Sequence, residues 1–334
     1  MNKIISKEQF SEKVFKLEIE APLIAKSRRA GHFVIVRVDE KGERMPLTIA
    51  GSNLEKGTIT LVVQTVGLSS TKLCKLNEGD YVLDVVGPLG QATHIQNYGT
   101  VVCAGGGVGV APMLPIIQAL KAAGNRVISV LAGRSKDLII LEEEVRASSD
   151  EVIIMTDDGS YGTKGLVTEG IESVIKREKV DKCFAIGPAI MMKFCCLLTK
   201  KYEIPTDVSL NTIMVDGTGM CGACRITVGG KTKFVCVDGP EFDGHQVDFD
   251  EMFKRMGSFK DVEREEMSHL EQHVCKVEPQ AEAKESECKP CSEKACQMPM
   301  EELLDRKAPW REELRKAMKP KERTAIHRCP MNEL

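Results

Sequence analysis

Residues 216–236 read DGTGMCGACRITVGGKTKFVC. Cys221 and Cys224 are separated by two residues, Cys236 follows after eleven more, and Asp216 stands five positions before Cys221. Two thiolates on a glycine-rich loop and a third from farther along the chain resemble the ligand pattern of a 2Fe–2S cluster, with the Asp216 carboxylate as fourth ligand. The alternatives are a zinc ribbon, a redox-active Cys-x-x-Cys pair or packed free cysteines, with Asp216 as a residue that caps the turn.

The composition limits the class of protein. The chain has 334 residues, enough for two or three domains, of which 42% are hydrophobic and 28% charged. Its net charge of −3 gives no electrostatic basis for nucleic-acid binding, and no apolar run reaches the length of a membrane span. The start of the chain lacks a signal-peptide core. We therefore expect a cytoplasmic protein whose thirteen cysteines are metal ligands and core residues rather than disulfides.

Residues 1–95 are predicted to form an antiparallel β-barrel. Short segments rich in Val, Ile, Leu and Thr alternate with turn residues, and no helical period appears between them. This pattern predicts strands at residues 13–21, 32–39, 46–52, 58–66 and 81–90.

The next part of the chain, residues 96–205, alternates between predicted strands and helices. Such alternation is typical of a doubly wound parallel sheet. Helices are expected at residues 111–124, 141–148, 166–178 and 190–202. Residues 206–250 hold the cysteine loop in a small domain, with strands expected at 207–213, 225–230 and 232–239. Residues 251–334 are charged and read as an exposed helix, a linker and an extended tail.

A glycine-rich turn, CAGGGVGVAP (residues 103–112), joins the first strand of this sheet to its first helix. Glycines at the end of a strand let the backbone approach a pyrophosphate, and the helix N-terminus offers unpaired N–H groups. The spacing differs from Gly-x-Gly-x-x-Gly, so an ordinary Rossmann assignment does not follow. The alternative is a strand-to-helix turn without a ligand.

Two motifs in the barrel are weak alone. In RMPLT (residues 44–48), an arginine and a hydroxyl could contact a phosphate and a flavin edge, or Arg44 could be an ordinary surface residue. In GLSS (residues 67–70), the hydroxyls could wrap a pyrophosphate or simply form a turn.

Together with GPLG (residues 87–90) and Gly187-Pro188, these motifs resemble the ferredoxin-NADP reductase superfamily. The iron–sulfur loop that follows is similar to that of dihydroorotate dehydrogenase electron-transfer subunits. It is still more similar to the small subunits of NADH-dependent reduced ferredoxin:NADP oxidoreductases, the electron-bifurcating transhydrogenases also labelled sulfide dehydrogenase-like. The resemblance covers about residues 1–250. In the first family four cysteines hold the cluster, whereas in the second an aspartate stands at the position of Asp216.

The resemblance implies a role for individual residues. The FAD ring and ribityl chain would be lined by Arg44, Pro46, Leu47 and Thr48, and the FAD phosphates by Ser69 and Ser70. The nicotinamide nucleotide would be bound by Gly105, Gly106, Gly107, Gly109, Ala111, Pro112, Asp157, Gly159, Gly187 and Pro188. The 2Fe–2S cluster would be held by Asp216, Cys221, Cys224 and Cys236.

The choice of nucleotide is open at this point. An arginine after the second strand of such a sheet can accept a 2′-phosphate, so Gly133-Arg134-Ser135 favours NADP(H). The family resemblance implies NAD(H), with NADP(H) bound by the partner subunit, and we follow the family.

The tail carries a second cysteine motif. Cys288, Cys291 and Cys296 have the spacing that opens some iron–sulfur or zinc sites, and Cys275 or Cys329 would have to complete the ligand set. The alternative is a docking arm with incidental thiols.

The expected activity is that of an oxidoreductase subunit that passes electrons between NAD(H), FAD and a 2Fe–2S cluster. The sequence shows no acid–base dyad or nucleophile for other chemistry, so the electrons are expected to leave this chain for a partner protein. The expected partner is a larger flavin/iron–sulfur subunit, and ferredoxin would exchange electrons through that complex. The alternative is an electron-transfer subunit for another enzyme, such as dihydroorotate dehydrogenase or a hydrogenase. A non-catalytic redox sensor or scaffold is a third interpretation.

Overall fold

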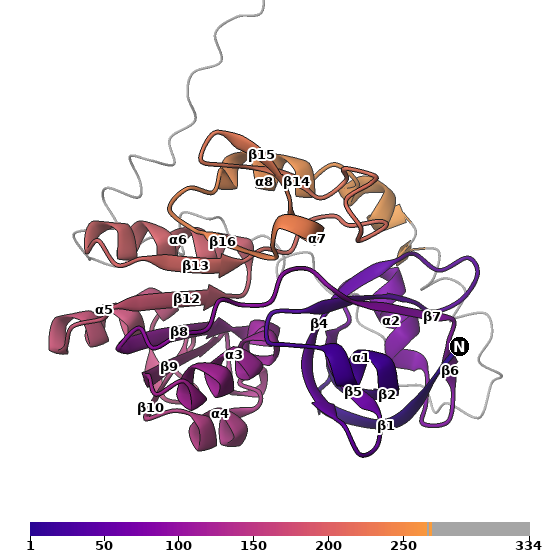
Figure 1. Cartoon of the computed structure of the whole chain (residues 1–334), viewed down its shortest axis with the longest axis horizontal. Helices are drawn as coiled ribbons and strands as arrows, with labels where there is room; N and C mark the ends of the chain where they lie inside the picture. The colour runs from indigo at the N-terminus through magenta and orange to yellow at the C-terminus, as the bar shows by residue number, and fades with distance from the viewer. Residues whose placement is uncertain (266, 269–334) are drawn as a thin grey trace, which may run out of the picture. The chain divides into compact units, whose positions relative to one another are not determined.

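The computed structural model describes residues 1–265 and 267–268, which fall within one compact unit. Two seven-stranded sheets and one two-stranded sheet make up the strands of this part of the chain (Figure 1). This architecture confirms the predicted combination of an antiparallel barrel and a parallel sheet, followed by a small segment that holds the cysteine loop. The predicted boundaries at residues 95, 205 and 250 stay predictions.

The first sheet is antiparallel and nearly closed. Its strand order is β6-β1-β2-β5-β4-β3-β7, and its two outermost strands are consecutive in the chain, separated by Leu83 alone. Because these edges meet at one residue, the sheet curls into a barrel around fully buried aliphatic side chains. The strands are β1 (Asn2–Ser11), β2 (Val14–Glu20), β3 (Phe33–Arg37), β4 (Met45–Asn53), β5 (Thr58–Gln64), β6 (Tyr81–Val82) and β7 (Asp84–Leu89).

Two short helices interrupt the barrel, so the expectation of strands alone in residues 1–95 is wrong. They are α1 (Pro22–Ser27) and α2 (Leu68–Lys75). Only two apolar side chains of α2, Leu73 and Cys74, are buried, and a helix of two turns is too short to show a period. The predicted hydroxyl-rich turn GLSS is therefore the start of a helix.

The second sheet has the order β11-β10-β9-β8-β12-β13-β16. Its first six strands run parallel, and the chain order reverses between β8 and β12, which makes this the topological switch point of a doubly wound sheet. The strands are β8 (Thr100–Gly106), β9 (Arg126–Gly133), β10 (Glu151–Thr156), β11 (Thr163–Lys164), β12 (Lys182–Ile186), β13 (Thr206–Ser209) and β16 (Glu241–Asp243).

Helices cover both faces of this sheet, as predicted (Figure 1). One face and the barrel share a hydrophobic cluster with α3 and α4, while α5 and α6 pack on the other face. No helix in the described ranges combines the length and the apolar character needed to cross a membrane. The elements are η1 (Gly107–Gly109), α3 (Val110–Ala122), η2 (Lys136–Leu138), α4 (Glu142–Ser148), α5 (Val167–Arg177) and α6 (Ala189–Lys201).

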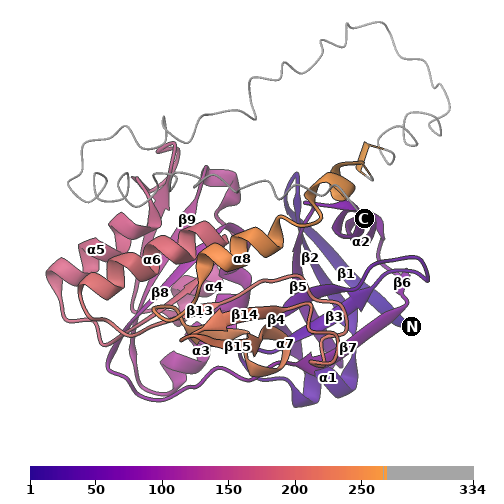
Figure 2. The same cartoon turned by 90° about the horizontal axis from the view of Figure 1, so that it is seen from above.

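The cysteine segment is built on the edge of the second sheet. Its hairpin pairs β14 (Arg225–Val228) with β15 (Lys231–Phe234), and β16 pairs with β13. Residues 235–238 form a short helix, α7 (Val235–Asp238), so the strand predicted at 232–239 is wrong in its second half. Helix α8 (Phe249–Met256) follows and contacts α6 and β14 (Figure 2).

Candidate functional site

The glycine-rich turn lies at the switch point. Gly105 and Gly106 end β8, and a Cβ on Gly109 would collide with the carbonyl oxygen of Ile186 and stand 2.7 Å from Gly187 Cα. Glycine is therefore required at position 109 for the start of α3 to approach the end of β12. Gly107 has a φ of +53° and its Cβ position faces open space, so this turn has room for a ligand.

The other predicted nucleotide residues lie along the same edge. Ala111 is in the first turn of α3, where its N–H has no acceptor within the helix and suits a phosphate, whereas Pro112 in the same turn has no N–H to donate. Pro188 begins α6 beside Gly187. Asp157 follows β10, two strands from β8, and burial raises the pKa of its carboxyl while the charge of Arg134 opposes that shift. Gly159 is close behind, with a φ of +78°.

The barrel motif meets the cysteine segment through Arg44. Its Nε donates a hydrogen bond to the carbonyl oxygen of Val215, at 2.7 Å. Pro46, Leu47 and Thr48 lie on β4, all half-buried. Their contact with FAD stays a prediction, but Arg44 joins the barrel to the residue that precedes Asp216.

The start of α2 is suited to a pyrophosphate in a way that differs from the expectation. The hydroxyls of Ser69 and Ser70 already have protein partners. Ser69 donates to Glu43 at 2.9 Å, and Ser70 Oγ accepts the N–H of Gly67 at 3.0 Å. A Cβ on Gly67 would meet no atom within 4 Å, so the space before the helix is open. The N–H groups of the first helical turn are therefore the better phosphate donors.

The four predicted cluster ligands form two close pairs. Cys221 Sγ donates to Asp216 Oδ1 at 3.3 Å, and Cys224 Sγ lies 3.3 Å from Cys236 Sγ. Two thiolates on one tetrahedral metal with bonds of about 2.3 Å are about 3.8 Å apart, close to the observed separation. Cys224 and Cys236 are buried, whereas Cys221 is exposed.

The arrangement of donors favours two metal ions over one. Within the described residues, no three His, Cys, Asp or Glu side chains converge on a point that could hold a single ion. A structural zinc site needs four donors on one ion, whereas a 2Fe–2S cluster takes two from each side. The two pairs of donors therefore fit the two irons of a 2Fe–2S cluster.

Asp216 organises the loop around itself. Its carboxylate accepts the N–H groups of Thr218 at 3.1 Å, Met220 at 3.0 Å and Cys221 at 3.1 Å. Burial raises the pKa of Asp216, but these bonds and the Cys221 thiol outweigh burial and lower the pKa to about 2. Asp216 therefore caps the turn, as one of the two interpretations expected. Its role as a cluster ligand stays a prediction, for which the carboxylate is ionised and lies beside Cys221.

The loop rests on the barrel. Gly217 has a φ of +77°, and a Cβ there would stand 2.8 Å from Leu89 Cδ1 on β7 and 2.9 Å from Ile35 Cγ1 on β3. The Gly219 N–H is directed at Cys236, while burial and the neighbouring Cys224 raise the pKa of the Cys236 thiol. The cluster loop and the barrel motif therefore lie in contact with each other.

The second cysteine motif cannot be placed relative to this site. Cys275, Cys288, Cys291, Cys296 and Cys329 lie outside the described residues, so the tail site stays a prediction. Two residues that the sequence reasoning missed contact the cysteine loop, Arg225 and Arg255. A cationic residue directly after Cys224 was a readable signal, but the contact of Arg255 spans 32 positions and needs the fold.

Comparison with known proteins identifies the family. The model of the iron-sulfur cluster binding domain of dihydroorotate dehydrogenase B matches residues 211–248. The chain is 50% identical over 264 residues to the dihydroorotate dehydrogenase B (NAD(+)) electron transfer subunit homolog of Thermotoga maritima, covering 79% of this chain and 93% of that protein. The chain belongs to the family of dihydroorotate dehydrogenase B electron-transfer subunits and their homologues. The electron transfer subunit from Desulforamulus reducens is 31% identical, over 73% of this chain and 96% of that one.

Solved structures support the assignment to this electron-transfer subunit family. A chain of the NADH-dependent reduced ferredoxin-NADP oxidoreductase, solved for insight into flavin-based electron bifurcation, matches with a TM-score of 0.76 and 47% identity, over 80% of this chain and 98% of that one. The cytochrome b5 reductase domain of Ulva prolifera nitrate reductase, at 20% identity and a TM-score of 0.52, shares the fold. The fold and the matched iron–sulfur domain confirm an oxidoreductase subunit with FAD, a 2Fe–2S cluster and NAD(H).

Proposed function

We propose that this chain is the small subunit of an electron-bifurcating complex that couples NAD(H), NADP(H) and ferredoxin. The observation that carries the proposal is Asp216 beside Cys221, 3.3 Å from its sulfur, where the dihydroorotate dehydrogenase subunits have a fourth cysteine. The similarity to a chain of the NADH-dependent reduced ferredoxin-NADP oxidoreductase supports it.

Different segments of the chain bind the dinucleotide, the flavin and the cluster. The switch-point turn binds the dinucleotide, and β4 with the start of α2 binds FAD. When bound, the flavin converts a hydride into single electrons, and the cluster carries these one at a time. Arg44 holds the barrel against Val215, so the flavin site and the cluster loop keep a fixed separation.

The exposed side of the loop is where a partner would receive electrons. Cys221 is exposed, whereas Cys224 and Cys236 are buried. Beside it Met220 is 90% exposed and Val215 49% exposed, and exposed apolar side chains next to a redox centre suit a protein partner. We propose a larger flavin/iron–sulfur subunit on this side, and ferredoxin reached through it.

Two substitutions test the ligand set on which the proposal depends. Asp216→Asn keeps an oxygen that accepts the loop N–H groups but lacks the anionic donor, so we expect loss of iron. Asp216→Cys restores a four-cysteine set, so we expect iron to be retained with a changed visible spectrum. Full iron and an unchanged spectrum in Asp216→Asn would show that Asp216 is not a ligand.

Purification of the tagged chain from its own organism tests the partner. We expect a larger subunit with its own flavin and iron–sulfur clusters, and a complex that reduces ferredoxin with NADPH only when NAD is present. A dihydroorotate dehydrogenase subunit in its place would support the second candidate, which the family match of residues 211–248 favours. Isolation without flavin would favour a sensor or scaffold.

The preference of this subunit for NAD(H) over NADP(H) and its location are proposals of the same kind. Arg134 could accept the 2′-phosphate of NADP(H), but we follow the family and propose NAD(H) for this subunit. Titration of flavin reduction with NADH and with NADPH decides between them. Half-reduction of the flavin at a lower concentration of NADPH than of NADH would reverse the choice. The cytoplasm stays our predicted location, on the argument from the thirteen cysteines.

A further inference from the structure

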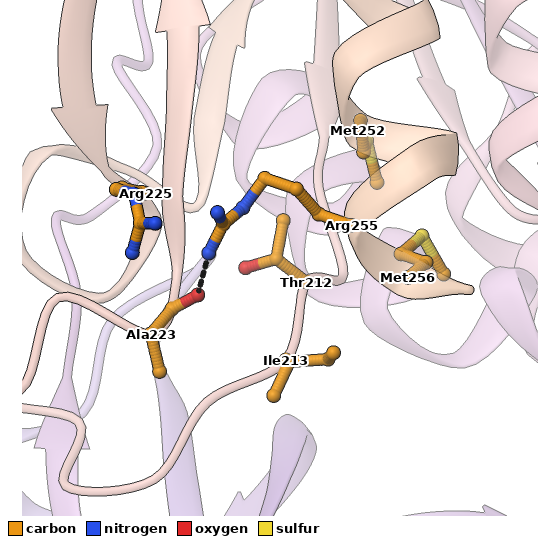
Figure 3. A pocket seen from close by; sticks show the side chains of 7 residues that line it. All are labelled: Thr212, Ile213, Ala223, Arg225, Met252, Arg255 and Met256. Carbon is orange, nitrogen blue, oxygen red and sulfur yellow. Dashed lines mark hydrogen bonds between the residues drawn. The ribbon is translucent and has the colours of Figure 1, made fainter. Parts of the chain in front are cut away.

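The outer side of the cysteine loop is held by two arginines. Arg225 Nη1 donates to the carbonyl oxygen of Gly222 at 3.2 Å, and Arg255 Nη2 donates to the carbonyl oxygen of Ala223 at 2.9 Å (Figure 3). These carbonyls belong to Gly222 and Ala223, the two residues between Cys221 and Cys224. Neither arginine is among the predicted cofactor or metal residues.

The direction of these carbonyls fixes the direction of the next N–H groups. In a planar trans peptide, the C=O of one residue and the N–H of the following residue point in opposite directions. With the Gly222 carbonyl turned outward, the Ala223 N–H points inward, and it lies 3.5 Å from Cys221 Sγ. The outward Ala223 carbonyl likewise turns the Cys224 N–H inward. The Ala223 N–H therefore points at a ligand sulfur, and Arg255 fixes the orientation of the adjoining peptide, between Ala223 and Cys224.

Helix α8 holds Arg255 in place. The Asp248 side chain caps the helix by accepting the N–H of Glu251 at 2.9 Å, and Met252 is buried with 1% exposure. One turn before Arg255, the Glu251 carboxylate accepts the N–H of Thr227 on β14 at 3.1 Å. The helix is thus attached to the strand that follows Cys224. This attachment fixes the position of the backbone that carries the Arg255 guanidinium.

The groups around the Arg255 guanidinium affect how strongly solvent screens its charge. Arg255 lines a small pocket with the apolar side chains of Ile213, Ala223, Met252 and Met256, together with Thr212 and Arg225 (Figure 3). Charges near apolar groups are screened less than charges in open water. Hydrogen bonds to the sulfurs and net charge are two of the terms that set the reduction potential of an iron–sulfur cluster.

We propose that Arg255 is a positioning residue that raises the reduction potential of the 2Fe–2S cluster by holding the Ala223 peptide. Arg225 acts in the same way on Gly222, from a more exposed position on the same pocket. The inference rests on the cluster site of the proposed function and not on the identity of the partner. A cationic clamp of this kind makes the cluster a better acceptor of electrons from the flavin.

Redox titration of the complete protein, followed by visible and EPR spectra of the cluster, tests the proposal. For Arg255→Met we expect the equilibrium constant for cluster reduction to fall about tenfold, which is about 59 mV for one electron. Lys254→Met is the matched control, because it removes the same charge from the same helix at an exposed position next to Arg255. Arg255→Lys keeps the charge without the forked donor and should give an intermediate potential.

Each outcome decides the matter. Equal potentials in Arg255→Met and Lys254→Met would overturn the proposal, because bulk charge would then explain any change. Loss of iron from Arg255→Met with its flavin retained would show an anchoring role only, and the potential of Arg255→Lys would then decide, a value below that of wild type supporting the proposal. If Arg255→Met loses both cofactors, Arg255→Lys decides, and a wild-type potential in that variant would overturn the proposal. Absence of any cluster from the wild-type protein would instead defeat the proposed function.

Discussion

Substitution of Gly217 by alanine tests the contact between the cluster loop and the barrel. The new Cβ would stand 2.8 Å from Leu89 Cδ1 and 2.9 Å from Ile35 Cγ1, and Ile35 is fully buried, with 0% exposure. A left-handed backbone costs a non-glycine residue about 1–2 kcal/mol, and overpacking costs about 1–3 kcal/mol. The expected loss of stability is therefore about 2–5 kcal/mol.

Gly230 provides a matched control in the turn between β14 and β15. Its φ of +74° resembles the +77° of Gly217, but a Cβ on Gly230 would meet no atom within 4 Å. Gly230→Ala should therefore cost the backbone term alone, about 1–2 kcal/mol. The difference between the two variants isolates the steric contact of the loop with the barrel.

Thermal melting of the holoprotein, followed by the visible absorbance of the cluster, is the assay. For a chain of this size, 1 kcal/mol lowers the midpoint by about 2 °C, so Gly217→Ala should melt about 4–10 °C below wild type and Gly230→Ala about 2–4 °C below it. Equal midpoints for the two variants would refute the reasoning, because the loop would then not press on the barrel.

Two further substitutions test other parts of the account. Gly109→Ala forces the start of α3 away from the end of β12 through the clash with Ile186, so we expect NADH to bind at least about tenfold more weakly with flavin content unchanged; unchanged affinity would place the nucleotide elsewhere. Glu241 accepts a hydrogen bond from Thr93 at 2.7 Å, and burial raises its pKa to about 7, with the charge of Asp207 adding to this and that of Lys182 opposing it. A raised carboxyl pKa means that the folded state holds the proton, so wild type should lose stability as pH rises from about 4.5 to 7, whereas Glu241→Gln should lack this loss. If the melting midpoints of the two proteins changed with pH in the same way across this range, the raised pKa of Glu241 would be contradicted.

Much of the fold was readable because its signals are local. Strands β2 to β5 show alternating or continuous β-branched residues, and α3, α5 and α6 show apolar faces of helical period over ten or more residues. The glycine turn at residues 103–112 was placed correctly between a strand and a helix, since glycine is readable wherever strand ends must approach closely.

The failures have physical reasons of two kinds. Helix α2 and helix α7 are too short for a period, and the Val-Cys-Val of α7 has the composition of a strand. The roles of Arg255 and Glu43 depend on contacts between distant segments, with Arg255 reaching Ala223 and Glu43 accepting from Ser69. Such pairings depend on packing between elements, which single-sequence patterns do not encode.

The central claim is that electrons pass from NAD(H) through the flavin to the cluster held by the Asp216–Cys236 segment. Rapid mixing of the holoprotein with NADH, followed by flavin absorbance and by EPR of samples frozen at intervals, tests it most directly. The account predicts that flavin bleaching comes first and that a reduced 2Fe–2S signal follows, at a higher level in wild type than in Arg255→Met. A flavin that bleaches fully while the cluster stays oxidised would contradict it.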